Sequence, residues 1–106
     1  MIKWVWMRTE YKLTLKINSR VLSRVVIDQH YKEKHSDVSD EIILELINQI
    51  NGRVFEIDSQ SGDFQYFTVE PVFSDSNPYR LVLLLCMNDD FLGVINAFRV
   101  QRSKYE

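Results

Sequence analysis

Two long apolar stretches near the end of the chain most constrain its fold. Residues 79–87 are apolar on both faces of a strand apart from Arg80, and residues 91–100 are nearly so. A strand that is apolar on both faces belongs in the interior of a sheet, with cover on each side. The polar run at 88–90, Asn-Asp-Asp, has the chemistry of a hairpin turn. The pattern therefore predicts two adjacent central strands joined by a tight turn.

A second hairpin is predicted near the start of the chain. Residues 11–17 alternate between apolar and polar side chains, which predicts a half-exposed strand. Residues 18–20 have turn chemistry, and the β-branched excess in residues 21–27 favours a second strand that folds back on the first. The apolar spacing in 21–27 also fits a helix, so that alternative stays open. Residues 1–8 are expected to add a short strand at an edge of the sheet.

Two helices are predicted in the middle of the chain. Asp28 can cap a short helix through residues 29–35, because its carboxylate accepts hydrogen bonds from the free amides of the first turn. Ser39 caps a longer helix, Val38 has the position of a hydrophobic staple, and Gly52 follows the last turn. The buried stripe expected along the longer helix consists of Ile43, Leu46, Ile47 and Ile50.

After Gly52 the signals turn back to strands. Residues 54–57 are expected to form a strand, residues 59–63 a turn, and residues 64–73 a longer strand rich in aromatic and β-branched side chains. With 106 residues, of which 45% are hydrophobic, the chain suits one domain, residues 1–106, with a single core. The predicted fold class is α+β: a mainly antiparallel sheet of about five or six strands, with the short and the longer helix packed on one face.

Cysteine and hydropathy content indicate where such a chain works. The single Cys86 cannot form an internal disulfide, and it lies in an apolar run where a small side chain packs well, so we expect neither an oxidising compartment nor a cysteine nucleophile. No apolar run approaches the roughly 20 residues of a membrane helix. The first residues lack the apolar region of a signal peptide. A cytoplasmic protein without membrane contact is expected.

The net charge of −2 conceals a segregation along the chain. Residues 1–35 carry eight Lys or Arg against three acids, residues 36–79 carry one against nine, and residues 80–106 carry four against three. A basic first third and an acidic middle suit a polyanion-facing side opposite a solvated side, and a mixed, solvated surface is the alternative. A protein that binds RNA mainly through phosphates is expected to carry a larger positive excess.

The predicted central hairpin brings two arginines close together if its loop has two residues. If residues 89–90 form a two-residue loop, Arg80 lies directly opposite Arg99. Like charges opposite one another on a sheet are unfavourable unless an anion lies between them, so the pair is a candidate phosphate clamp. A three-residue loop would put the arginines on opposite faces. In the alternative interpretation each arginine reaches solvent or pairs with an acid such as Glu70.

Other residues complete an inventory for cleaving RNA through its own 2′-hydroxyl. That reaction needs a base, an acid and cations that stabilise the phosphate. His30 and Lys34 share a face of the short helix, and Tyr79 adds a hydroxyl. Asn96 interrupts an apolar strand and either orients a site residue or bonds to neighbouring backbone. A surface or packing histidine is the alternative for His30.

Metal and cofactor sites are not predicted. His30 and His35 are five residues apart and point away from one another on a helix, and the chain contains no other histidine. No glycine-rich phosphate loop or zinc-ligand spacing occurs in the sequence. We therefore expect neither a metal nor an organic cofactor.

The order of these segments resembles small toxin ribonucleases of the RelE and BrnT kind. The similarity covers roughly residues 21–102 and is carried by the segments Val25–His30, Val38–Ile43, Tyr79–Val82 and Val94–Arg99. The resemblance implies a metal-independent RNA endonuclease of a bacterial toxin–antitoxin pair, neutralised by a partner chain. The resemblance matches His30, Arg80 and Arg99 to the histidine and basic site residues of that family and so implies catalytic roles for them. The inventory above adds Lys34, Tyr79 and Asn96 as expected substrate contacts. The acidic net charge departs from the family, whose members are usually basic.

A second hypothesis belongs to a different functional class. A non-enzymatic interaction protein, such as an immunity protein, antitoxin or nuclease inhibitor, would use the acidic middle segment to bind a basic partner. Trp4 and Trp6, if exposed on an edge strand, would indicate a homodimer or partner contact; packing in the core is the alternative. The ribonuclease hypothesis requires His30 to lie near both arginines and requires those arginines to be free of carboxylates.

Overall fold

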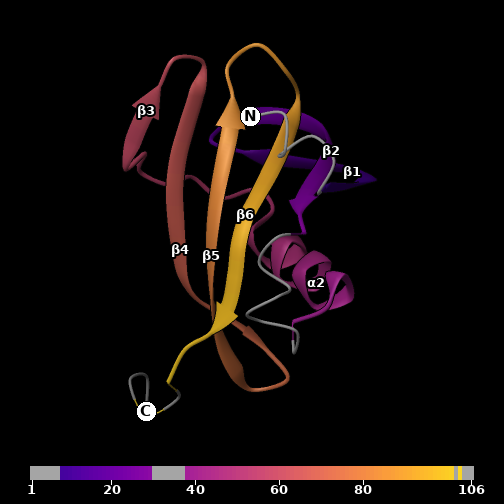
Figure 1. The fold of residues 1–106 in the computed structure, drawn as a ribbon, viewed down its shortest axis with the longest axis vertical. Coiled ribbons are helices and arrows are strands. Elements are labelled where there is room, and N and C mark those ends of the chain that lie inside the picture. Colours follow the sequence, from indigo (N-terminus) through magenta and orange to yellow (C-terminus); the bar gives the residue numbers. More distant parts are fainter. Residues whose placement is uncertain (1–7, 30–37, 102, 104–106) are drawn as a thin grey trace.

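One sheet and one helix make up the described part of the chain, which comprises residues 8–29, 38–101 and 103 of a computed structural model. In chain order the elements are β1 (Arg8–Ile17), β2 (Arg20–Asp28), α2 (Asp40–Ile50), β3 (Ser59–Ser61), β4 (Phe64–Ser74), β5 (Asn77–Cys86) and β6 (Phe91–Arg99). The strand order across the sheet is β1-β2-β6-β5-β4-β3 (Figure 1). The β2–β6 pair is parallel and the other neighbours are antiparallel. The predicted α+β class with a mainly antiparallel sheet is confirmed.

The first hairpin forms as its alternation and turn residues predict. Ile17 pairs with Arg20 across a two-residue turn, Asn18-Ser19, and both turn residues have positive φ, 52° and 66°. Paired positive φ angles match the twist of the flanking strands, and asparagine tolerates this region better than most residues. The helical alternative for residues 21–27 is wrong, because the β-branched residues there form β2.

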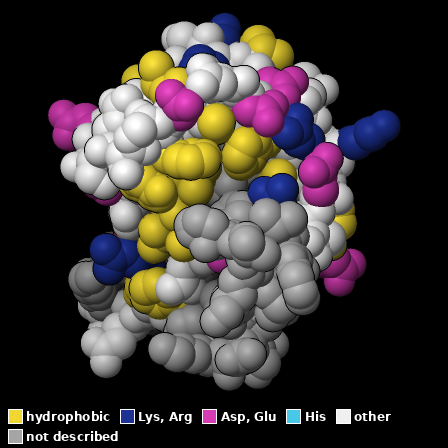
Figure 2. Space-filling model, turned by 45° about the horizontal axis from the view of Figure 1, so that its top comes forward, with side chains coloured by type: hydrophobic (Ala, Val, Ile, Leu, Met, Phe, Trp, Pro, Cys, Tyr) yellow, Lys and Arg dark blue, Asp and Glu magenta, His cyan; other side chains and the backbone are white. Residues whose placement is uncertain are grey.

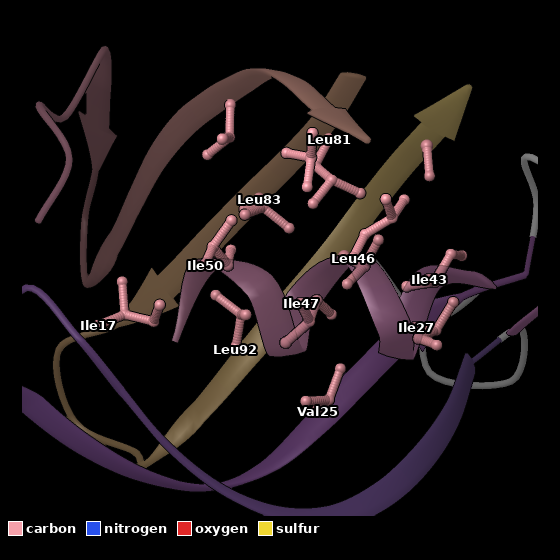
Figure 3. Close-up of a cluster of buried hydrophobic side chains, with 14 of the residues drawn as sticks. Ile17, Val25, Ile27, Ile43, Leu46, Ile47, Ile50, Leu81, Leu83 and Leu92 are labelled. Carbon is pink, nitrogen blue, oxygen red and sulfur yellow. The ribbon is translucent and has the colours of Figure 1, made fainter. Parts of the chain in front are cut away.

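Helix α2 also begins and ends where its capping signals predict. The Ser39 Oγ accepts a hydrogen bond from the Ile42 amide at 3.2 Å, and Gly52 adopts φ of 89° just after the helix. Val38 is buried before the cap, as expected of a hydrophobic staple. The predicted stripe packs against one face of the sheet (Figure 3). Its members are Ile43, Leu46, Ile47 and Ile50, and they face Val25, Ile27, Leu81, Leu83 and Leu92.

The two apolar stretches form the central strands β5 and β6, as predicted. Both faces of this pair are buried, because a second, smaller cluster lies on the side away from α2. Within it, Leu84 of β5 lies opposite Gly93 of β6, and the missing side chain of Gly93 leaves the space that Leu84 fills. The buried residues of this cluster are Val26, Leu84, Cys86 and Phe91.

Two expectations about the middle of the chain are wrong. Residues 54–57 form no strand, and the short strand β3 occupies part of the predicted turn at 59–63. The Phe55 amide donates to the Asn18 side chain at 2.6 Å instead of to a neighbouring strand. Phe55 and Ile57 pack half-buried against the core, so their alternation reflects a loop that covers the core. The predicted edge strand at 1–8, except Arg8, and the short helix at 29–35, except Gln29, lie outside the described residues.

Candidate functional site

The predicted arginine clamp does not form, because the register of the central hairpin differs from the expected one. Arg80 pairs with Phe98, and Arg99 pairs with Tyr79. Four residues separate β5 from β6, and the register shifts again between Val82 and Leu83. Successive residues of a strand point to opposite faces, so a displacement of one residue places Arg80 and Arg99 on opposite sides of the sheet. The prediction that they lie directly opposite one another is wrong.

Each arginine instead has a local partner. The Nε of Arg80 lies 3.5 Å from Oε1 of Glu70, and its guanidinium lies over the ring of Phe98 at 6.0 Å from the centroid. Arg99 donates to Oδ1 of Asn77 at 3.0 Å. The alternative in which Arg80 pairs with Glu70 is therefore confirmed.

The remaining predicted site residues do not gather around either arginine. Tyr79 is only 4% exposed and belongs to the core cluster. The Asn96 Oδ1 accepts a hydrogen bond from the Ala97 amide at 2.9 Å, which is the neighbouring-backbone role that the sequence left open. His30 and Lys34 lie outside the described residues. The described part of the predicted site is thus divided between two faces of the sheet and the core.

The acids of the middle segment are also dispersed. Asp63, in the β3–β4 turn, accepts a hydrogen bond from Asn88 at 2.7 Å at one end of the sheet. Asp75 lies in the β4–β5 turn at the other end (Figure 1). Figure 2 shows acidic and basic side chains scattered around an apolar area instead of gathered by sign. Asp63 and Asp75 therefore belong to opposite ends of the sheet and not to one acidic patch.

A groove lies where the edge strand β1 passes beside α2. It has a volume of about 370 Å³ and opens to solvent. β1 is the last strand at this end of the sheet, so its outer side has no strand neighbour among the described residues. The groove residues are Tyr11, Lys12 and Leu13 of β1 and Leu44, Glu45 and Asn48 of α2.

Hydrogen bonds at both ends of α2 hold the helix beside β1. At its start, the Tyr11 hydroxyl donates to Asp40 at 2.5 Å, and this bond raises the pKa of Tyr11. At its end, the Gly52 amide donates to the Lys16 carbonyl at 2.7 Å, and the Lys16 amide donates to the Asn51 side chain at 2.8 Å. Helix and strand run in the same direction, and both cover about 17 Å between these contacts. The middle turns of α2 therefore face β1 across the groove.

The exposed side of β1 carries unequal charges. Glu10 lies 3.4 Å from the Nε of Arg24 on the neighbouring strand, and it shares this guanidinium with Asp89 and Asp90. Lys12 and Lys16 are exposed, and within the described part of the chain neither forms an ion pair. The exposed face of β1 therefore presents two lysines without an ion pair, and Glu45 places a carboxylate on the helix side of the groove.

An ion-pair network that the sequence did not reveal ties β2 to the β5–β6 loop. Arg24 contacts Asp89 at 2.9 Å and Asp90 at 2.8 Å, and it lies over the Phe91 ring. The guanidinium lowers the pKa of Asp89, and the carboxylate raises the pKa of Arg24. The sequence predicts only a turn at Asp89 and Asp90, because Arg24 lies 65 residues away from Asp89 in the chain and no local pattern connects them.

No described side-chain group has the composition of a metal site, and comparisons place no constraint on function. Histidine, cysteine and acidic side chains do not gather in threes within the described residues. No helix among those residues has the length and apolar character of a membrane span. Searches against family models, curated proteins and solved structures find no match to this chain. The resemblance to toxin ribonucleases consequently stays a prediction.

Proposed function

We propose that this domain is a non-enzymatic interaction module that binds a segment of a partner protein in the groove between β1 and α2. The groove itself is the observation that carries the proposal: side chains of Tyr11, Leu13 and Leu44 line part of an open groove beside a sheet edge that has no strand neighbour among the described residues. An open groove with apolar side chains in its wall suits a peptide chain, since recognition of extended peptides combines main-chain contacts with pockets for side chains.

The arrangement of the arginines supports binding over catalysis. A phosphate clamp needs two cations that converge, whereas Arg80 and Arg99 lie on opposite faces and each contacts another side chain. RNA cleavage through His30 remains a prediction without this support. Immunity proteins, antitoxins and nuclease inhibitors, which form the second hypothesis from the sequence, share the property proposed here, namely that they act by binding another protein.

A peptide-display selection on the immobilised domain tests the proposal. We expect enriched peptides whose binding is at least tenfold weaker to Leu44→Lys, because lysine keeps the helix propensity of leucine but places a charge in the groove. Leu44 is half-buried and packs against the core, so this variant also loses stability.

A second variant separates blocking from unfolding. Asn48 lines the groove but is exposed, so Asn48→Arg narrows the groove without emptying the core. Val54→Arg is the matched control, because Val54 is 73% exposed and lies outside the groove. Groove binding predicts a loss with Asn48→Arg and no change with Val54→Arg. A selection without enrichment, or enriched peptides that bind Asn48→Arg as well as the wild type, would overturn the proposal.

A further inference from the structure

We infer that the bound segment adds to the sheet as a further strand along the outer edge of β1, and that it alternates apolar and acidic residues. This inference rests on the proposed function and specifies the chemistry of the partner. The backbone of β1, the faces of its side chains and its charge each provide one part of the evidence.

Part of the outer side of β1 is already hydrogen-bonded to the segment that follows α2. Among the described residues β1 bonds to β2 on one side only, and on each side of a register shift between Lys12 and Leu15 alternate residues direct their N–H and C=O groups outward. At Lys16 both outward groups are bonded, to Asn51 and Gly52. The Asn18 amide continues the same line by donating to the Arg53 carbonyl at 3.0 Å. A bound segment beside the groove would pair with the half of β1 that precedes the register shift.

The two faces of β1 determine what side chains an added strand needs. Tyr11 and Leu13 lie on the helix side and are half-buried against the core, whereas Lys12 and Lys16 belong to the exposed alternate set. Neighbouring strands share faces, so every second side chain of the added strand would enter the groove toward Leu44. These positions favour apolar residues.

The other side chains of the added strand would lie beside the lysines. Opposite charges across neighbouring strands are favourable, and like charges are unfavourable. Lys12 and Lys16 have no ion pair among the described residues, whereas Glu10 shares Arg24 with Asp89 and Asp90. Carboxylates on the partner would therefore balance charge that the domain leaves unbalanced.

The same charges favour a foreign peptide over a second copy of this chain. Lysines on an edge strand are a common device against edge-to-edge association of identical sheets. A pairing of two β1 strands centred on Lys12 would bring two lysines face to face. An acidic residue beside Lys12 meets an opposite charge instead.

Synthetic peptides test the charge of the partner. An acetylated peptide of alternating leucine and glutamate is compared by fluorescence anisotropy with its leucine–lysine counterpart, at low and at high salt. We expect at least tenfold tighter binding of the glutamate peptide, with a preference that shrinks as salt screens the charges. Lys12→Glu combined with Lys16→Glu should reverse the preference, and Arg99→Glu, which reverses one charge on β6, should leave the preference in place. Equal binding of both peptides, or a preference unchanged by the double substitution, would overturn the acidic part of the inference.

Amide methylation tests strand addition separately from binding. Each amide of a groove-dependent peptide from the display selection is N-methylated in turn, which removes one donor at a time. Strand addition predicts large losses at every second amide and small losses between them, because only alternate amides face β1. If peptides bind in the groove and tolerate every methylation, strand addition is ruled out and the proposed function stands. If no peptide binds in a groove-dependent way, both the inference and the proposed function are ruled out.

Sedimentation of the unliganded chain addresses the second copy. The inference predicts a monomer at concentrations where the peptide binds. A dimer that Asn48→Arg dissociates would assign the edge to a second copy and overturn the inference.

Discussion

Replacing Gly93 by alanine should destabilise the domain, although the same change in most strands is favourable. A Cβ atom on Gly93 would lie 2.8 Å from Cγ and 3.1 Å from Cδ1 of Leu84, well inside the roughly 3.5–4.0 Å of an ordinary carbon contact. Leu84 is 4% exposed, and its Cγ is the branch point of the side chain, so it cannot move aside freely. Such overpacking costs about 1–3 kcal/mol.

A smaller gain offsets part of this cost. Removing a glycine from a strand restores about 0.5–1 kcal/mol, because alanine loses less backbone entropy on folding. The expected net loss is therefore about 1 kcal/mol, which moves the urea midpoint by roughly half a molar at the slope usual for small domains. Urea unfolding followed by circular dichroism measures the change.

A double-mutant cycle identifies the cause. Leu84→Ala alone should cost about 2–3 kcal/mol, because it leaves a cavity in the smaller cluster. In that background Gly93→Ala should become neutral or stabilising, with a coupling of at least about 1 kcal/mol between the two positions. Gly93→Ala that is as stable as the wild type, or that costs the same with and without Leu84, would refute the close packing described for this pair.

Three further predictions concern the cap, the ion pair and the arginines. Ser39→Ala should lower the free energy of unfolding by about 1 kcal/mol, since the Ile42 amide loses its acceptor, and calorimetry would show no shift in melting temperature if the cap were unimportant. Arg24 lowers the pKa of Asp89 below its ordinary 3.8, so the ion pair contributes stability above pH 3.8 and loses that contribution as the pH falls through the lowered pKa. The difference in unfolding free energy between the wild type and Asp89→Asn should therefore vanish in acid. A difference that persists unchanged in acid would contradict the ion pair. Purified wild type and Arg80→Ala should leave RNA equally intact on gels, and degradation that depends on Arg80 would restore the ribonuclease hypothesis and remove the interaction proposal.

The elements that the sequence predicted correctly are those whose signals are local. The alternation of residues 11–17, the turn at Asn18 and the cap at Ser39 each act within a few residues of the chain, so neither fold nor partner is needed to interpret them. The apolar stretches that became β5 and β6 are equally direct, because only an interior position buries both faces of a strand. Even the stripe of α2 was evident, since its period is that of the helix itself.

The features that the sequence did not predict depend on residues far apart in the chain. Residues 54–57 alternate like a strand but form a loop. The Phe55 amide donates to the Asn18 side chain instead of to a neighbouring strand, and Phe55 and Ile57 pack against the core. The observed pairing of β5 with β6 differs by one residue from the register that the arginine clamp required. The four-residue connection between the strands and the register shift near Val82 together produce this difference. A change of one residue in register moves a side chain to the opposite face of the sheet. A predicted site that depends on strand pairing is therefore less reliable than the prediction of the strands themselves.

From its sequence alone, this chain determined its hairpins, its capped helix and an α+β sheet with an apolar centre, because those features follow from periodicity and from capping within short segments. Tertiary structure alone decided that Arg80 and Arg99 face apart, that Arg24 holds the β5–β6 loop, and that α2 lies beside β1, the edge strand of the described sheet. The physical reason is that registers and helix–strand spacings are set by contacts between distant residues, which no local pattern encodes.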